Sequence, residues 1–321
     1  MKIEGKTIEE KLAEIKEKMN KAEEDSDEIA IRNLLADTGD VYLEEGMNEK
    51  HREFYNKAYE KAVGASKKLD YLIVILYSYF NNDMIEEFCE LFPKCQALNK
   101  EDGDWEKKNK LNIYEGIIML LHRDFKSAAS LFISVINTFN AEEIMPFATL
   151  VTYSSLLGII SLKRSEFKEK VINSSEVLGV YLENQLLSEF IDSIYTGKYY
   201  RVFPLLIDVN EKILAKDKFL SIHRSQFIRK LRSLIFSQYL QSYKTVKLDR
   251  MAADFGVSAK FLDYELYLLI STDELACKID KVNKVVESFH PDSEYMQFKS
   301  LIKDGDKLIE RMHKVAKQIQ A

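Results

Sequence analysis

Apolar residues recur at helical spacing along most of the chain, and short polar segments interrupt them. Near the start, Ile8, Leu12 and Ile15 lie three or four positions apart, so one face of a helix would carry them all. An acidic run at residues 23–28 then ends this stripe. We therefore expect an N-terminal helix and an acidic linker over residues 1–28.

Pairs of such amphipathic segments follow one another over residues 29–216. Polar turns separate them at residues 81–83, 123–124 and 164–165, and turns of this kind recur about every 35 to 42 residues. Stacked helical repeats have this period, because each helix pair buries its apolar face against the next pair. The pattern predicts a TPR-like right-handed helical-repeat solenoid over residues 29–216, with an irregular helical bundle as the alternative.

Two residues near these turns have distinct expected roles. Asp124 directly precedes a helical segment over residues 125–139, and an Asp at that position can accept hydrogen bonds from the free amides of the first turn. We expect it to cap that helix. The single Trp of the chain, Trp105, stands where the preceding helix would begin, and we expect it to be a packing anchor.

The sequence changes character after residue 217. Three helical segments and then two short β-prone runs follow in order: residues 221–243, 248–255, 258–270, 277–279 and 285–287. Gly256 suits the tight turn after the second helix, and Ser258 can cap the third. Helix, turn, helix and a small hairpin is the order of a winged helix. We predict such a module over residues 217–292 and a mostly α-helical chain.

Many winged helices bind DNA through their third helix. The net charge of that helix therefore indicates whether this chain could bind DNA. Residues 258–270 contain one cation, Lys260, and two anions, Asp263 and Glu265. DNA presents dense negative charge, which DNA-reading proteins meet with several Lys or Arg. The whole chain carries a net charge of −6. We do not expect nucleic acid as a partner.

The small sheet of the predicted module offers a different kind of contact. A sheet of two or three strands leaves an unpaired edge, which can add a strand from a neighbouring chain. We therefore predict a protein interface at Cys277, Ile279 and Val285. The alternative is that this edge is simply short and solvated.

The last segment, residues 293–321, has a heptad pattern. Phe298, Gly305, Met312 and Ile319 are seven apart, and a second apolar position follows three residues after the first three, as in helices that pack together. The predicted interface residues of this bundle helix are Phe298, Leu301, Ile302, Leu308, Met312, Val315 and Ile319. Folding back onto the chain's own solenoid is the alternative.

No pattern in the sequence indicates catalysis. Cys89, Cys95 and Cys277 form no disulfide or zinc spacing, and the five His occur in unrelated contexts, with no Gly-rich phosphate loop or nucleophile elbow. We expect no enzyme activity, no cofactor and no metal. The longest strongly apolar run, residues 71–80, is too short to cross a bilayer, and no signal-peptide pattern opens the sequence, so we expect a soluble intracellular protein without a membrane partner.

Several stretches resemble one known family. They are residues 103–105, 123–129, 151–153, 169–172, 251–257, 277–283 and 291–293. Together with the helical repeats and the winged helix, they resemble the PCI family, whose members occur in the proteasome lid, the COP9 signalosome and translation initiation factor three. The resemblance runs from about residue 29 to the C-terminus, and residues 277–283 favour the branch of the proteasome lid.

This resemblance implies a function that composition alone does not. It implies a non-catalytic scaffold subunit of the lid of the 26S proteasome regulatory particle, within a hetero-oligomer in the cytoplasm and nucleus. The implied partners are other PCI subunits of the lid and the ATPase ring of the base. A PCI scaffold of the signalosome or of initiation factor three is the alternative.

Overall fold

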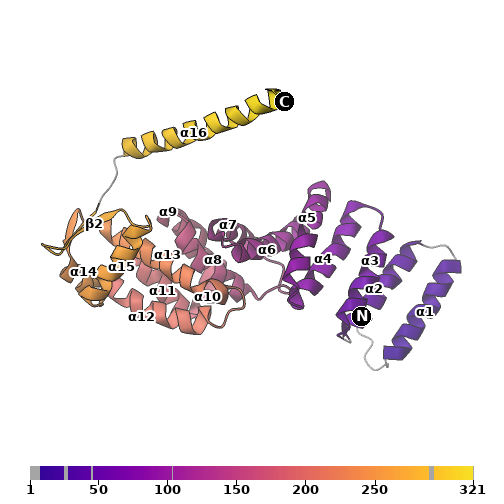
Figure 1. Ribbon diagram of the computed structural model, residues 1–321. Coiled ribbons are helices and arrows are strands. Elements are labelled where there is room, and N and C mark those ends of the chain that lie inside the picture. The colour runs from indigo at the N-terminus through magenta and orange to yellow at the C-terminus, as the bar shows by residue number, and fades with distance from the viewer. Residues whose placement is uncertain (1–7, 25–27, 45, 103, 289–292, 321) are drawn as a thin grey trace. The chain divides into compact units, whose positions relative to one another are not determined.

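The computed structural model describes residues 8–24, 28–44, 46–102, 104–288 and 293–320 (Figure 1). It divides into two compact units, Met1–Asn184 and Gln185–Ala321. The described residues are mostly α-helical, with one small sheet, so the predicted fold class is confirmed. The predicted acidic linker lies partly outside the described residues, since α1 ends at Glu24 and α2 begins at Glu28.

The first unit is a stack of helices in chain order. They are α1 Ile8–Glu24, α2 Glu28–Glu44, α3 Asn48–Glu60, α4 Ala65–Asn81, α5 Ile85–Asp102, α6 Trp105–Leu121, α7 Phe125–Val135, the 3-10 helix η1 Ile136–Thr138, α8 Phe147–Ser161, α9 Arg164–Phe167, the π-helix η2 Lys168–Ile172 and α10 Ser175–Glu183. The strongest contacts join α2 to α3, α4 to α5, and α6 to α7. The polar turns at residues 81–83 and 123–124 predict the second and third of these pairs, whereas residues 164–165 begin the short helix α9.

The turns between paired helices have a common local cause. Asp83 and Arg123, at the ends of α4 and α6, adopt left-handed backbone angles with φ of 59° and 64°, which closes a helix and reverses the chain. After the second turn, the Asp124 carboxylate accepts a hydrogen bond from the Ser127 amide at 3.2 Å. The predicted cap at the start of α7 is therefore confirmed.

The core of the first unit depends on a close approach between α6 and α7. A Cβ atom on Gly116 would lie 2.7 Å from the ring of Phe132, which is fully buried. Glycine thus allows an aromatic ring of α7 to rest directly on the backbone of α6. Ile113, Tyr114 and Ile117 are also buried, and burial on several faces is what an inner helix of a stack requires.

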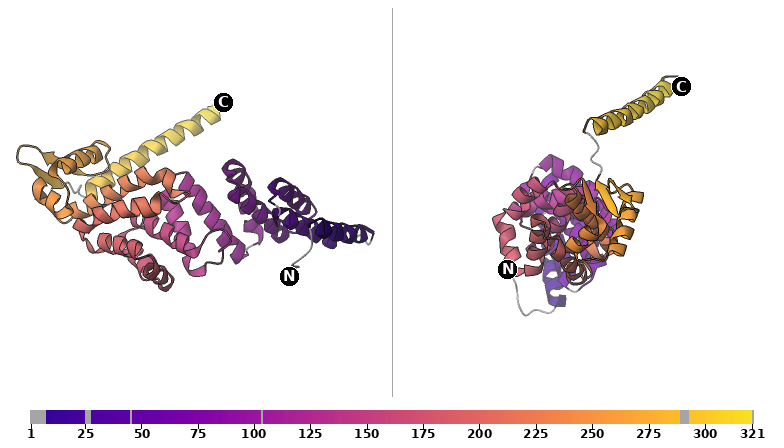
Figure 2. Two further views of the ribbon diagram at one scale, coloured as in Figure 1. Left: turned by 90° about the horizontal axis from the view of Figure 1, so that it is seen from below. Right: turned by 90° about the vertical axis from the view of Figure 1, so that its left-hand side faces the viewer.

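The second unit contains the winged-helix order. Its elements are α11 Gln185–Thr196, α12 Tyr199–Val209, the π-helix η3 Asn210–Leu214, α13 Leu220–Leu240, β1 Thr245–Lys247, α14 Leu248–Phe255, α15 Ala259–Ser271, β2 Cys277–Asp280, β3 Val285–Ser288 and α16 Ser293–Gln320. The strands form an antiparallel sheet in the order β1-β3-β2. Figure 2 shows α16 as one long helix.

Phe255, the last residue of α14, is the centre of the module's core. It is fully buried, and the rings of Tyr199, Phe203, Phe236 and Tyr239 all lie within 5.7 Å of it, centroid to centroid. Aromatic pairs at such distances add to the stability that burial provides. Gly256 follows with a φ of 65°, which ends α14 and turns the chain toward α15. The aromatic cluster around Phe255 therefore holds together the helices next to α15 and the sheet.

Candidate protein-interaction surfaces

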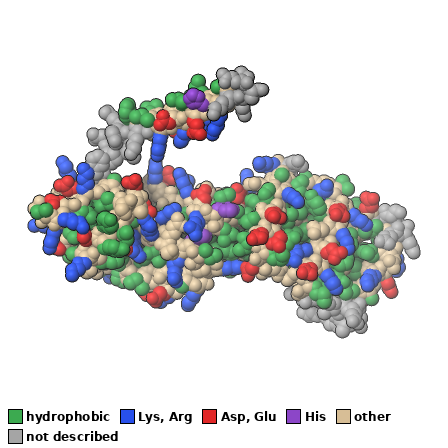
Figure 3. All heavy atoms as spheres, viewed as in Figure 1, with side chains coloured by type: hydrophobic (Ala, Val, Ile, Leu, Met, Phe, Trp, Pro, Cys, Tyr) green, Lys and Arg blue, Asp and Glu red, His purple; other side chains and the backbone are tan. Residues whose placement is uncertain are grey.

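Helix α16 carries a long apolar stripe. Seven large apolar side chains on it are each more than half exposed: Phe298, Leu301, Ile302, Leu308, Ile309, Met312 and Val315. In Figure 3 the hydrophobic side chains gather along the upper face of this helix and charged ones along its lower face. An exposed stripe of this length is typical of an interaction site, because burying one such side chain stabilises a contact by about 1.5–3 kcal/mol.

The heptad positions thus share one exposed face over the described part of α16. The side chain of Ile319 lies outside the described residues. That these residues form an interface stays a prediction.

The small sheet has an outer strand, β2, but only some of the predicted interface residues lie on it. β3 is the central strand, and Val285 pairs with Lys247 on one side and Asp280 on the other. The prediction that Val285 lies at an edge is therefore wrong. The physical reason is β1, a three-residue strand before α14 that covers the side of β3 expected to be free.

Cys277 and Ile279 do lie on an outer strand, β2. Cys277 is 6% exposed and Ile279 is half-buried, so this edge would offer a partner its main chain more than these side chains. Burial raises the pKa of the Cys277 thiol to about 11, which keeps it protonated and unreactive at neutral pH.

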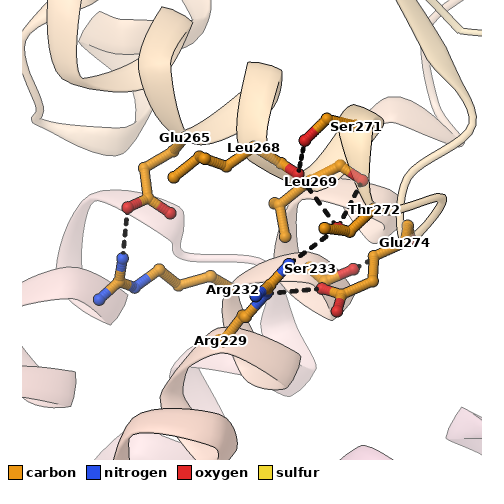
Figure 4. A network of polar contacts seen from close by, with 9 residues as sticks. All are labelled: Arg229, Arg232, Ser233, Glu265, Leu268, Leu269, Ser271, Thr272 and Glu274. Atoms are coloured by element: carbon orange, nitrogen blue, oxygen red, sulfur yellow. Dashed lines mark hydrogen bonds and ion pairs between the residues drawn. The ribbon is translucent and has the colours of Figure 1, made fainter.

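A polar clamp joins α13 to α15 and the turn that follows it (Figure 4). Arg232 donates to the Glu265 carboxylate at 2.7 Å, and Arg229 reaches the Glu274 carboxylate at 3.2 Å and the Thr272 hydroxyl at 2.8 Å. Charge-assisted hydrogen bonds of this kind are stronger than neutral ones. Two cations of α13 are thus engaged within the module.

The outward face of α15 is aromatic. Phe261, Tyr264 and Tyr267 are 38%, 61% and 57% exposed, while the anion Glu265 turns toward Arg232. A surface that binds the phosphate backbone needs several free cations. This face is more suited to apolar contact with a protein.

A pocket of about 290 Å³ lies against α4 and α6 in the first unit. The Lys107 ammonium at its wall is held by the Asp70 carboxylate at 2.7 Å and by the carbonyl and hydroxyl oxygens of Ser66 at 3.0 and 2.7 Å. The lysine is therefore fully engaged in joining the two helices. Its charge is balanced locally, as in a structural ion pair.

The described residues carry no cluster of side chains typical of a metal site. Within those ranges, no group of three or more His, Cys, Asp or Glu side chains could hold a metal ion. Burial raises the pKa of the Cys95 thiol to about 12, so this thiol is a poor nucleophile at neutral pH. Across the same part of the chain, no helix is both long enough and apolar enough to cross a bilayer.

Comparison with known proteins decides the family. The family model described as "26S proteasome subunit RPN7" matches residues 1–170, and the PCI domain model matches residues 206–290. The chain belongs to the RPN7 family. The family resemblance is thus confirmed, and it reaches further toward the N-terminus than residue 29.

Relatives in this family match almost the whole chain. The 26S proteasome non-ATPase regulatory subunit 6 of Oryza sativa subsp. japonica is 36% identical over 97% of this chain and 80% of its own length. The 26S proteasome regulatory subunit RPN7 of Saccharomyces cerevisiae is 34% identical over 96% of this chain and 73% of its own length. The COP9 signalosome complex subunit 1 of Arabidopsis thaliana is less similar, at 27% over 61% of this chain and 45% of its own length.

Sequence reasoning missed two features of this RPN7-family chain. Trp105 is 55% exposed at the first turn of α6, so its expected role as a packing anchor is wrong. The clamp of Arg229 and Arg232 was also missed. Its partners lie more than thirty residues away along the chain, and the one sequence signal is the cluster of cations in α13, which also contains Arg224 and Lys230.

Proposed function

We propose that this chain is a non-catalytic scaffold subunit of the lid of the 26S proteasome regulatory particle. Membership of the RPN7 family supports this, since its relatives are named as proteasome regulatory subunits. The single observation that carries the scaffold role is the exposed apolar stripe of α16. The Oryza sativa relative is named as a non-ATPase regulatory subunit, and a scaffold needs surfaces more than catalytic groups.

In the proposed mechanism, the helical stack, the edge of β2 and the stripe of α16 each have a separate role. The helical stack holds its form because each helix pair packs on the next. The edge of β2, with Cys277 and Ile279, would add main-chain hydrogen bonds to a neighbouring PCI subunit. The stripe of α16 would supply most of the free energy of docking, because that energy comes mainly from a few large, fully desolvated side chains.

The proposed partners are other PCI subunits of the lid and the ATPase ring of the base. Assembly would fix the relative positions of these parts while they handle ubiquitinated substrates. The proposed location is the cytoplasm and nucleus, where such a particle would act on soluble proteins.

The test is affinity purification of the tagged chain, followed by mass spectrometry of the proteins that come with it. We expect the full chain to recover lid subunits. The triple variant Leu301→Asp, Leu308→Asp and Met312→Asp should recover them at least about tenfold less, because each change places a charge in the apolar stripe.

A matched control separates the stripe from general effects of charge. The variant Gln297→Asp, Ser300→Asp and His313→Asp adds the same number of Asp residues to exposed positions of α16 outside the stripe. It should assemble normally. Normal assembly of the stripe variant, or failure of both, would refute the docking role of α16.

A signalosome subunit is the second candidate, because residues of this chain also align with the COP9 signalosome subunit. Recovery of signalosome proteins in the same experiment would favour that function. Recovery of initiation factor three subunits would point to the remaining PCI assembly.

A further inference from the structure

The apolar stripe of α16 has one gap. Gly305 occupies the heptad position that Phe298 and Met312 hold one repeat before and after. A Cβ atom on Gly305 would meet nothing within 4 Å, so the described chain does not require glycine there. Glycine is also among the least favourable residues inside a helix. The gap is therefore a notch that a side chain of another molecule can fill.

The same helix carries a side chain that fits this notch. Leu308 is 60% exposed and lies three residues after Gly305 on the same stripe. In an antiparallel pair of identical helices, Gly305 can face Leu308 of the second copy, and the twofold axis repeats the contact. A large residue then packs against the smallest one, as close-packed interfaces require.

The remaining layers of this register also match. Phe298 faces Val315 of the second copy, and Leu301 faces Met312. Each of these positions is more than half exposed in the single chain. The pairing would therefore cover the whole described stripe and leave no layer without an apolar partner.

Charges beside the stripe select this register. Asp304 and Arg311 occupy the same heptad position, one repeat apart, beside the stripe. In an antiparallel pair, residues at this position of one helix lie next to residues at the same position of the other helix. With Gly305 facing Leu308, Asp304 lies near Arg311 of the second copy, twice over. A shift of one heptad either way would instead place Asp304 against Asp304 or Arg311 against Arg311, which repel.

A parallel pair fits less well. It would set Gly305 against Gly305 and leave a hole in the middle of the interface, and such holes are destabilising. It would also place Asp304 opposite the apolar Ile309 rather than a cation. Both steric and charge complementarity favour the antiparallel arrangement.

We propose that the free chain forms an antiparallel homodimer through α16. The dimer covers the same stripe that would dock into a larger assembly, so the two states exclude each other. A second copy thereby protects the stripe until partner helices replace it. This inference concerns the chain alone and holds whether or not the proposed function is correct.

The test is sedimentation velocity of the purified full chain over a range of concentrations. We expect a species of twice the 37.4 kDa chain mass. Asp304→Arg and Arg311→Asp should each raise the dissociation constant at least about tenfold, because each turns two attractive pairs into repulsive ones. The double variant should restore dimerisation to within about threefold of the original chain.

Control variants carry the same charge changes outside the interface. Glu310→Arg matches Asp304→Arg, Lys303→Asp matches Arg311→Asp, and both positions are exposed away from the stripe. Both controls should dimerise normally. Gly305→Leu should raise the helix content of α16 and yet weaken the dimer, because it fills the notch.

Three results would overturn the inference. The chain could sediment as a monomer at about 100 µM, a concentration at which a specific pair of this size should form. The double charge variant could stay as weak as the single ones. Gly305→Leu could dimerise as well as the original chain, which would show that no side chain enters the notch.

Discussion

The ion pair between Arg232 and Glu265 allows a quantitative test of how α13 and α15 are held together. Replacing Arg232 with Met removes a donor 2.7 Å from a carboxylate whose side chain is only 15% exposed. A partly buried charge without a partner destabilises a fold by about 1–3 kcal/mol, and a fully buried one by more. Because Arg232 is itself 28% exposed, water reaches the site, and we expect a loss of about 2 kcal/mol.

Removing both charges should cost much less. In the double variant Arg232→Met and Glu265→Leu, no unpaired charge remains and the site is filled by apolar groups. We expect its free energy of unfolding to lie within about 1 kcal/mol of the original chain. Arg229→Met is the control, because the pair of Arg229 with Glu274 is 46% and 35% exposed and should contribute less than about 1 kcal/mol.

Amide hydrogen exchange followed by mass spectrometry reads this effect locally. A loss of about 2 kcal/mol should speed exchange in α13 and α15 about 30-fold. Trp105 lies in the first unit, so its fluorescence should stay unchanged and report that this unit is intact. If the double variant exchanges as fast as Arg232→Met, the loss does not come from an unpaired Glu265, and the reasoning fails.

Three further changes test the first unit and the thiols. Gly116→Ala should destabilise the unit by about 1–2 kcal/mol in urea unfolding, since the clash with Phe132 exceeds the gain in helix propensity; greater stability would contradict this. Asp124→Ala should cost about 1 kcal/mol through the lost cap of α7, and Asp124→Asn should recover most of it. Because burial raises the pKa of Cys95 to about 12 and of Cys277 to about 11, little thiolate forms near neutrality. Mass spectrometry should show little alkylation of either thiol at about pH 8, and the rate of alkylation should rise as the pH approaches those values. Rapid alkylation of Cys95 or Cys277 in the folded chain would be inconsistent with their burial.

Local patterns in the sequence were enough to predict most of the helices. The cap at Asp124, the left-handed turn at Gly256 and the heptads of α16 each depend on a few neighbouring residues, and each was found. Such signals work because the hydrogen bonds of a helix join residues that are close in sequence.

Non-local features were harder to predict. β1 has only three residues, Thr245–Lys247, too few to show the alternation that indicates a strand. Without β1, the sequence predicts β3 as an outer strand, and Val285 was therefore placed at an edge. In the structure, β1 pairs with that side of β3. The partners of Arg229 and Arg232 likewise depend on which helices meet in space.

The chain order of the elements also has a consequence for synthesis. Most contacts of the first unit join helices that are neighbours in the chain, so each pair can fold as it leaves the ribosome. Helix α16 follows the helices of the first unit and the sheet of the second unit in chain order, and it therefore emerges after them. During synthesis, the apolar stripe of α16 is therefore exposed only after the other helices and the sheet have been made. This order delays association through the stripe until those elements can fold.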